Sequence, residues 1–96
     1  MFIVSLTYLK PLEVIDSLLE EHVAWLKANY ADGVLLASGR KVPRTGGILL
    51  ARAESREALD AVLAGDPFHR EGAARYEVIE FAASMAAPGL EALINA

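Results

Sequence analysis

The hydrophobic and polar positions along the chain predict strands from continuous apolar runs and helices from apolar residues that recur at steps of three and four. Residues 2–9 are rich in β-branched and large apolar side chains, which favours a strand. Lys10-Pro11 closes this strand, because proline cannot donate to a ladder and is favoured at a helix start. From Leu12 to Tyr30, apolar residues recur at steps of three and four, which is typical of a long amphipathic helix.

The remaining pattern predicts three more strands, a second helix and a helical tail. In order these are a strand at residues 34–38, a loop at 39–46, a strand at 47–52, a helix from Ser55 to Gly65, a strand at 74–82 and a short helix after Pro88-Gly89. The order β-α-β-β-α-β with right-handed crossovers is the ferredoxin-like split βαβ, an α+β fold with both helices on one face of an antiparallel sheet. A chain of 96 residues with 54% hydrophobic content forms one core and not two, so we expect one domain over residues 1–96.

Three of the predicted strands are apolar on both faces. Residues 2–4, 34–37 and 48–51 lack the alternation expected of a sheet with helices on one side only. A second copy packed sheet against sheet would cover the free face and give a dimeric α+β barrel, with the C-terminal helix as a clasp. The alternative is that the C-terminal helix folds back over its own sheet, although it offers few apolar residues for so large a face. We expect a homodimer.

Charge and composition exclude several classes of partner. The formal charge is -4, and no run of Lys or Arg could neutralise a row of phosphates, so neither nucleic acid nor an anionic membrane surface is expected. The absence of cysteine excludes disulfides, thiolate nucleophiles and Cys-ligated metals. No apolar run approaches the ~20 residues of a membrane span, and the N-terminus shows no basic leader. We expect a cytoplasmic protein.

One histidine and one aspartate are the main candidates for chemistry. His22 lies about 60° from the centre of the apolar stripe of the first helix, and Asp66 precedes a proline that biases its backbone to an extended shape. We expect the two helices to run side by side in roughly the same direction, which lets these side chains meet. A carboxylate that accepts from one imidazole nitrogen fixes the tautomer and makes the other nitrogen a better base. The alternatives are a structural histidine with a satisfied ring nitrogen and an ordinary turn aspartate.

Polar residues near the expected pocket are weaker candidates. Ser38, near the end of its strand, could donate to a substrate oxygen or be an ordinary strand-end hydroxyl. Arg40, Arg44 and Arg70 flank the pocket and could clamp a carboxylate, although loop arginines are usually solvated. His69 could be a second acid, but the two histidines and Asp66 lack the tight spacings of metal ligands, so we predict no metal site.

Aromatic residues could wall a pocket for a planar ring. Trp25, Phe68 and Tyr8 are available for this role, and each is equally suited to the core or to an interface.

Four stretches of the chain form a specific combination. These are the helical histidine within residues 20–26, the strand end Leu36-Ala37-Ser38-Gly39, the hairpin return Pro43-Arg44-Thr45-Gly46-Gly47, and Gly65-Asp66-Pro67-Phe68 leading to residues 76–81. Together they resemble the YciI-like (YCII-related) domain family, over nearly the whole chain.

The resemblance implies a dimeric α+β barrel with a histidine and aspartate pair in a pocket close to the dimer interface. This pair maps onto His22 and Asp66, with Ser38 nearby. Relatives of similar fold include a chlorohydroquinol dehydrochlorinase and muconolactone isomerases. Many members have Ser-Gly-Pro where this chain has Ser38-Gly39-Arg40, so this chain adds a cation to the pocket rim and favours an anionic substrate.

We therefore expect a cofactor-free enzyme that acts on a small polar or aromatic metabolite by proton abstraction or elimination, as a lyase, isomerase or dehydrochlorinase would. His22 is the expected acid/base and Asp66 its orienter. The expected substrate-binding residues are Ser38, Gly39, Arg40 and Phe68. The alternatives are a small-molecule-binding or interaction module that uses the same cavity without catalysis, and a purely structural dimer partner.

Overall fold

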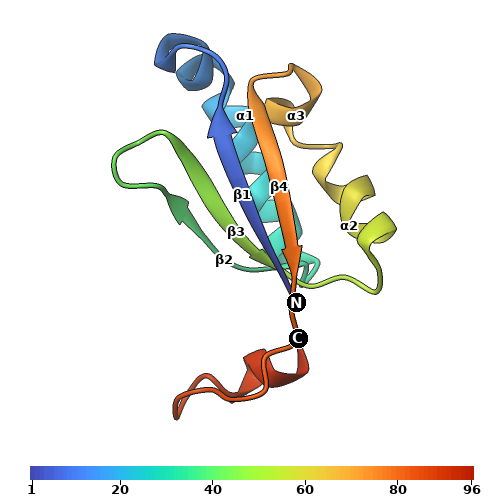
Figure 1. Cartoon of the computed structure of the whole chain (residues 1–96). Helices are drawn as coiled ribbons and strands as arrows, with labels where there is room; N and C mark the ends of the chain where they lie inside the picture. The colour runs from blue at the N-terminus through green and yellow to red at the C-terminus, as the bar shows by residue number, and fades with distance from the viewer.

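The computed structural model describes residues 1–96 as one antiparallel sheet with helices on one face (Figure 1). Its elements are β1 (Phe2–Tyr8), α1 (Leu12–Ala31), β2 (Leu35–Arg40), β3 (Gly46–Ala51), α2 (Arg56–Leu63), α3 (Pro67–Arg70), β4 (Ala74–Glu80) and the 3-10 helix η1 (Glu91–Asn95). The four strands are ordered β2-β3-β1-β4, and every neighbouring pair is antiparallel. The predicted ferredoxin-like α+β fold is confirmed.

The second strand extends further than its composition predicted. Gly39 and Arg40 were placed in the hairpin loop, but they pair with Ile48 and Gly47 of β3 and so belong to β2. Glycine has a weak preference for strands, but the partner strand supplies the hydrogen bonds, so the ladder continues through Gly39. This extension positions Arg40 on a regular element.

A short helix, α3, lies where only a turn was predicted. Asp66 is its N-cap, with the side-chain oxygen accepting from the Phe68 backbone N–H, and Pro67 occupies the first helical turn. Aspartate followed by proline is a recognised helix start, but a helix of four residues is too short to show a hydrophobic period.

The two long helices run in opposite directions, so the prediction of a common direction was wrong. α1 leaves the Tyr8 end of β1 and leads to Leu35, which pairs with Ala51 at the other end of the sheet. α2 follows Ala51 and leads back toward Ala74, which pairs with Tyr8. The physical reason is that β1 and β3, the strands that the helices follow, are antiparallel to one another.

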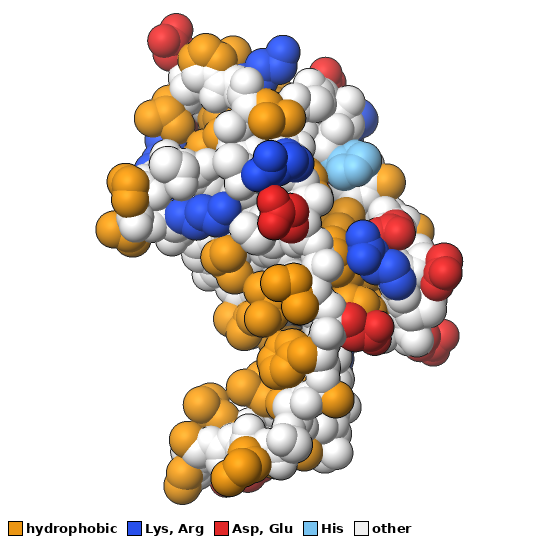
Figure 2. Space-filling view, in the orientation of Figure 1, with side chains coloured by type: hydrophobic (Ala, Val, Ile, Leu, Met, Phe, Trp, Pro, Cys, Tyr) orange, Lys and Arg blue, Asp and Glu red, His pale blue; other side chains and the backbone are white.

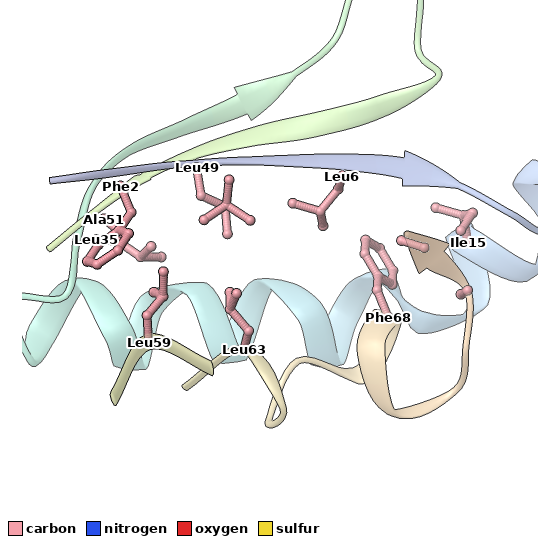
Figure 3. Packing of buried hydrophobic residues seen from close by; sticks show 12 residues of the cluster. Phe2, Leu6, Ile15, Leu35, Leu49, Ala51, Leu59, Leu63 and Phe68 are labelled. Carbon is pink, nitrogen blue, oxygen red and sulfur yellow. The ribbon is translucent and has the colours of Figure 1, made fainter. Parts of the chain in front are cut away.

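The core fills the space between the sheet and the helices. Figure 3 shows Leu6 and Leu49 pointing from the sheet toward Leu63 of α2 and Phe68 of α3. The twelve buried hydrophobic residues are Phe2, Val4, Leu6, Ile15, Leu35, Leu49, Ala51, Leu59, Leu63, Phe68, Ala73 and Ala74. Burying one Leu or Phe side chain contributes roughly 1.5–3 kcal/mol, so this layer is the main source of stability.

The helix-free face of the sheet is apolar at one end and polar at the other. Ala37, Leu50, Ile3 and Ile79 form one cross-strand row, and Ile79 is 58% exposed. Figure 2 shows hydrophobic side chains gathered over the lower part of this face and along the C-terminal segment. That segment extends away from the sheet (Figure 1), so it does not fold back over the open face as the alternative prediction had it.

None of the helices combines the length and the apolar character that a membrane crossing requires. The cytoplasmic location and the lack of nucleic-acid and membrane partners stay predictions from the sequence.

Candidate active site

The structure brings His22 and Asp66 together. Nδ1 of His22 lies 2.8 Å from Oδ1 of Asp66; the carboxylate is completely buried, and the histidine is 8% exposed. Since an ionised carboxylate only accepts hydrogen bonds, we assign the proton of the neutral imidazole to Nδ1. His22 comes from the middle of α1, and Asp66 from the N-cap of α3, so two elements distant in sequence build the pair.

Asp66 accepts two further hydrogen bonds. The backbone N–H of Phe68 donates to Oδ1 at 3.1 Å, and the hydroxyl of Tyr76 donates to Oδ2 at 2.5 Å. A buried charge without partners is costly, and these three donors satisfy both oxygens of the carboxylate. Burial, together with the neighbouring Asp66 carboxylate, raises the pKa of Tyr76 above its usual range, so this hydroxyl stays protonated and donates.

Tyr76 was missed as a site residue, because the sequence pattern presents it only as an apolar strand position. Its cross-strand partner Leu6 belongs to the core, which places Tyr76 on the helix-facing side of β4. Two signals were available beforehand: this alternation along β4, and the buried turn after α2 that carries Asp66.

Aromatic rings hold the plane of the imidazole. The Phe68 ring stacks on His22 with centroids 4.0 Å apart and planes 13° apart, and the Trp25 ring lies 5.9 Å from His22. Trp25 also donates from Nε1 to the Val62 carbonyl at 3.2 Å, which ties α1 to α2. Phe68 is 2% exposed and packs edge-on against Tyr8, so it supports the histidine as well as lining the pocket.

A cavity of about 180 Å³ borders the histidine. Nε2 of His22 makes no hydrogen bond within the chain, and it is not among the fully buried polar atoms that lack a partner, so it keeps contact with solvent. The cavity walls come mainly from apolar residues of α1, β1 and β3. An imidazole with one nitrogen fixed and the other open toward a cavity can accept or return a proton.

The far wall of the cavity is the edge strand β2. Ser38, Gly39 and Arg40, which were expected from the sequence to bind substrate, all line it, and that role stays a prediction. Ser38 pairs with Leu49 and Arg40 with Gly47, both on the helix-facing side of β3. The Ser38 hydroxyl lies 2.6 Å from the hydroxyl of Tyr30, a second tyrosine contact that the sequence did not indicate.

The other candidates have different partners. Arg44 binds Asp16, and Arg70 binds Glu21 on the exposed side of α1. His69 is exposed, and its ring packs against Tyr76 at 5.2 Å. No three His, Asp or Glu side chains gather in a group that could hold a metal ion.

A four-stranded antiparallel sheet with both crossover helices on one face defines a ferredoxin-like α+β domain, here with a small cavity beside a buried histidine and aspartate pair. The family model of the YCII-related domain matches residues 1–82, and the chain belongs to this family.

Comparison with known proteins adds a structural neighbour. None of the curated proteins compared with the chain matches it. Among solved structures, the chain is similar to 5-chloro-2-hydroxyhydroquinone dehydrochlorinase (TftG) from Burkholderia phenoliruptrix AC1100, in complex with 2,5-dihydroxybenzoquinone. The TM-score is 0.70 at 22% identity, over 84% of this chain and 93% of the neighbour. At this level of identity the likeness concerns the fold.

Proposed function

We propose that the protein is an enzyme in which His22 transfers a proton to or from a small metabolite while Asp66 orients the imidazole. One observation carries the proposal: Nδ1 is bound by a buried carboxylate at 2.8 Å while Nε2 is left without a partner beside a cavity. A purely structural histidine would have both nitrogens satisfied or enclosed by packing. Positioned acid/base groups of this kind typically accelerate a reaction by roughly 10²–10⁴-fold.

In the proposed step, the lone pair of Nε2 takes a proton from the substrate. The electron pair of the broken bond forms a new double bond; in an elimination the leaving group departs with its own bonding electrons, and in an isomerisation the π electrons of a neighbouring carbonyl of the substrate move onto its oxygen. The resulting imidazolium donates from Nδ1 to Asp66, whose charge stabilises it. The N–H of Phe68 and the hydroxyl of Tyr76 keep the carboxylate in place. Such a reaction needs no cofactor, because an acid/base and an acidic bond suffice.

The structural neighbour supports this class of reaction. Its name describes a dehydrochlorinase, and its ligand is a single substituted ring. Loss of HCl is an elimination, for which a base near the acidic hydrogen is the first requirement. A cavity of about 180 Å³ is of the size that one such ring needs.

Turnover of a substrate panel tests the proposal. We would incubate the protein with halogenated hydroxyquinols, small lactones and enol acids, and follow chloride release and ultraviolet absorbance. The expected result is turnover by the wild type, a loss of about 100-fold or more in His22→Ala, and normal turnover in His69→Ala, which alters the exposed histidine. Equal rates for wild type and His22→Ala would reject the catalytic role, and saturable binding without turnover would identify a binding module instead.

We also propose that a second copy of the chain covers the apolar end of the open sheet face. The row through Leu50, Ile3 and Ile79 supports this, because an apolar patch that continues onto the exposed Phe81 is unfavourable in water. A copy related by a two-fold axis presents the same patch and is therefore its own complement.

A further inference from the structure

Arg40 is the one arginine of the chain whose side chain makes no hydrogen bond or ion pair. Four other arginines bind carboxylates, and the fifth, Arg52, donates to the Gly33 carbonyl at 2.8 Å. Arg40 instead lines the cavity that also borders His22. A guanidinium presents a planar fork of donors that matches a carboxylate, so an unpaired one at a cavity is suited to an anionic ligand.

The sheet register places a gap between Arg40 and the core. Arg40, Gly47 and Leu6 form one row across β2, β3 and β1, and all three line the cavity. Neighbouring strands lie about 4.8 Å apart, so the backbones of Arg40 and Leu6 are roughly 10 Å apart. Because Gly47 carries no side chain, the space between them stays open. The same row continues to Tyr76, the residue that holds Asp66.

A hydroxyl pair lies next to Arg40. Ser38 precedes Arg40 by two residues and therefore projects from the same face of β2. Its hydroxyl and that of Tyr30 are 2.6 Å apart, and their mutual hydrogen bond uses only one of their two protons. The other proton is available to an oxygen of a ligand.

The volume of the cavity sets the size of the ligand. An apolar cavity of about 150 Å³ accepts benzene, and the cavity here is about 180 Å³ with walls that include Leu19, Leu26 and Leu49. One six-membered ring with a few substituents fills such a space.

We propose that the site takes a small cyclic organic anion of about one ring. Its carboxylate or enolate oxygen binds Arg40 and the hydroxyl pair of Ser38 and Tyr30, and its ring lies over Gly47 with the reacting bond toward Nε2 of His22. The position of the reacting bond rests on the proposed function, whereas the binding of the anion does not.

Calorimetric titration with benzoate and its neutral isostere benzamide tests the anion subsite. The wild type should bind benzoate at least about tenfold more tightly, because a charge-assisted hydrogen bond is worth more than a neutral one. Arg40→Gln should bring the two affinities together, and Arg40 is exposed, so the substitution should leave the thermal melt unchanged. The matched control Arg75→Gln, on the opposite edge strand, should keep the full preference.

The outcomes separate this inference from the proposed catalysis. Equal affinity of the wild type for both ligands, no binding of either, or an Arg40→Gln variant that keeps the preference would overturn the anion subsite. His22→Ala should retain the preference for benzoate. Arg40-dependent binding without turnover of any panel member would leave the subsite standing and reject the catalysis. Turnover that depends on His22 but shows no preference for anions would support the catalysis and reject the anion subsite.

Discussion

The Tyr76 hydroxyl donates to Oδ2 of Asp66 at 2.5 Å, on the side of the carboxylate away from His22. The His22–Asp66 pair therefore extends to a third side chain. Two hydrogen bonds join Tyr76 of β4, Asp66 at the start of α3 and His22 of α1 in a row. Because Asp66 is fully buried and both of its oxygens accept hydrogen bonds, its orientation is fixed by the fold.

Replacing Asp66 by asparagine tests the role of its charge. Asp66→Asn keeps the shape and can still accept from Nδ1 of His22, but it carries no charge to stabilise an imidazolium. We expect kcat to fall about 100-fold or more with little change in KM, measured on any panel member that the wild type turns over. Asp60→Asn, an exposed aspartate of α2 paired with Arg56, is the matched control. Full kcat in Asp66→Asn would contradict an electrostatic role.

Tyr76 should make stability depend on alkaline pH. Burial and the Asp66 carboxylate raise the pKa of Tyr76 in the folded protein above the value of about 10 that the unfolded chain has. Its contribution is therefore complete below about pH 10 and is lost as the pH rises toward the folded pKa. In that window the unfolded state has released a proton that the folded state retains, so stability falls by about 1.4 kcal/mol per pH unit.

Denaturant unfolding of Tyr76→Phe measures this contribution. At neutral pH the variant should lose about 1–3 kcal/mol, because Oδ2 of Asp66 is left without its donor. Above about pH 10 the free energy of unfolding of the variant should fall less steeply than that of the wild type. The two slopes should differ by about 1.4 kcal/mol per pH unit. Tyr30→Phe, which alters an exposed tyrosine outside this chain of bonds, should leave the slope unchanged. Parallel slopes for wild type and Tyr76→Phe would refute the assignment.

Elements that bury a full period of apolar residues were predictable from the sequence. α1 spans twenty residues and displays its period several times, whereas β1, which is apolar on both faces at residues 2–4, was predicted from its β-branched and large apolar side chains. α3 has four residues and no period, and its start could be found only from the cap chemistry of Asp66 and Pro67.

The site was predictable in part for the same reason. His22 stood out because an ionisable ring on an apolar stripe needs a partner, and the partner, Asp66, is polar in a buried turn. Tyr76 and Tyr30 did not stand out, since a tyrosine fits an apolar pattern whether or not its hydroxyl makes a hydrogen bond to another side chain. The exit of Arg40 from the loop into β2 depends on pairing with Gly47, which is a long-range contact that local composition does not encode.

The open face of the sheet yields the prediction on assembly. Ile79 is 58% exposed in the apolar row, so in a sheet-to-sheet dimer its side chain is buried against the partner. Ile79→Asp would place a carboxylate there, and an unpaired buried charge costs several kcal/mol, so the dimer should dissociate about 100-fold more readily or be lost. Light scattering coupled to size-exclusion chromatography measures this. Arg75→Asp introduces the same side chain on β4 at the polar end of the same face and should leave the dimer intact. At about 100 μM a stable interface of this kind would be saturated. A wild type that is monomeric at this concentration would contradict the proposal that a second copy covers this face.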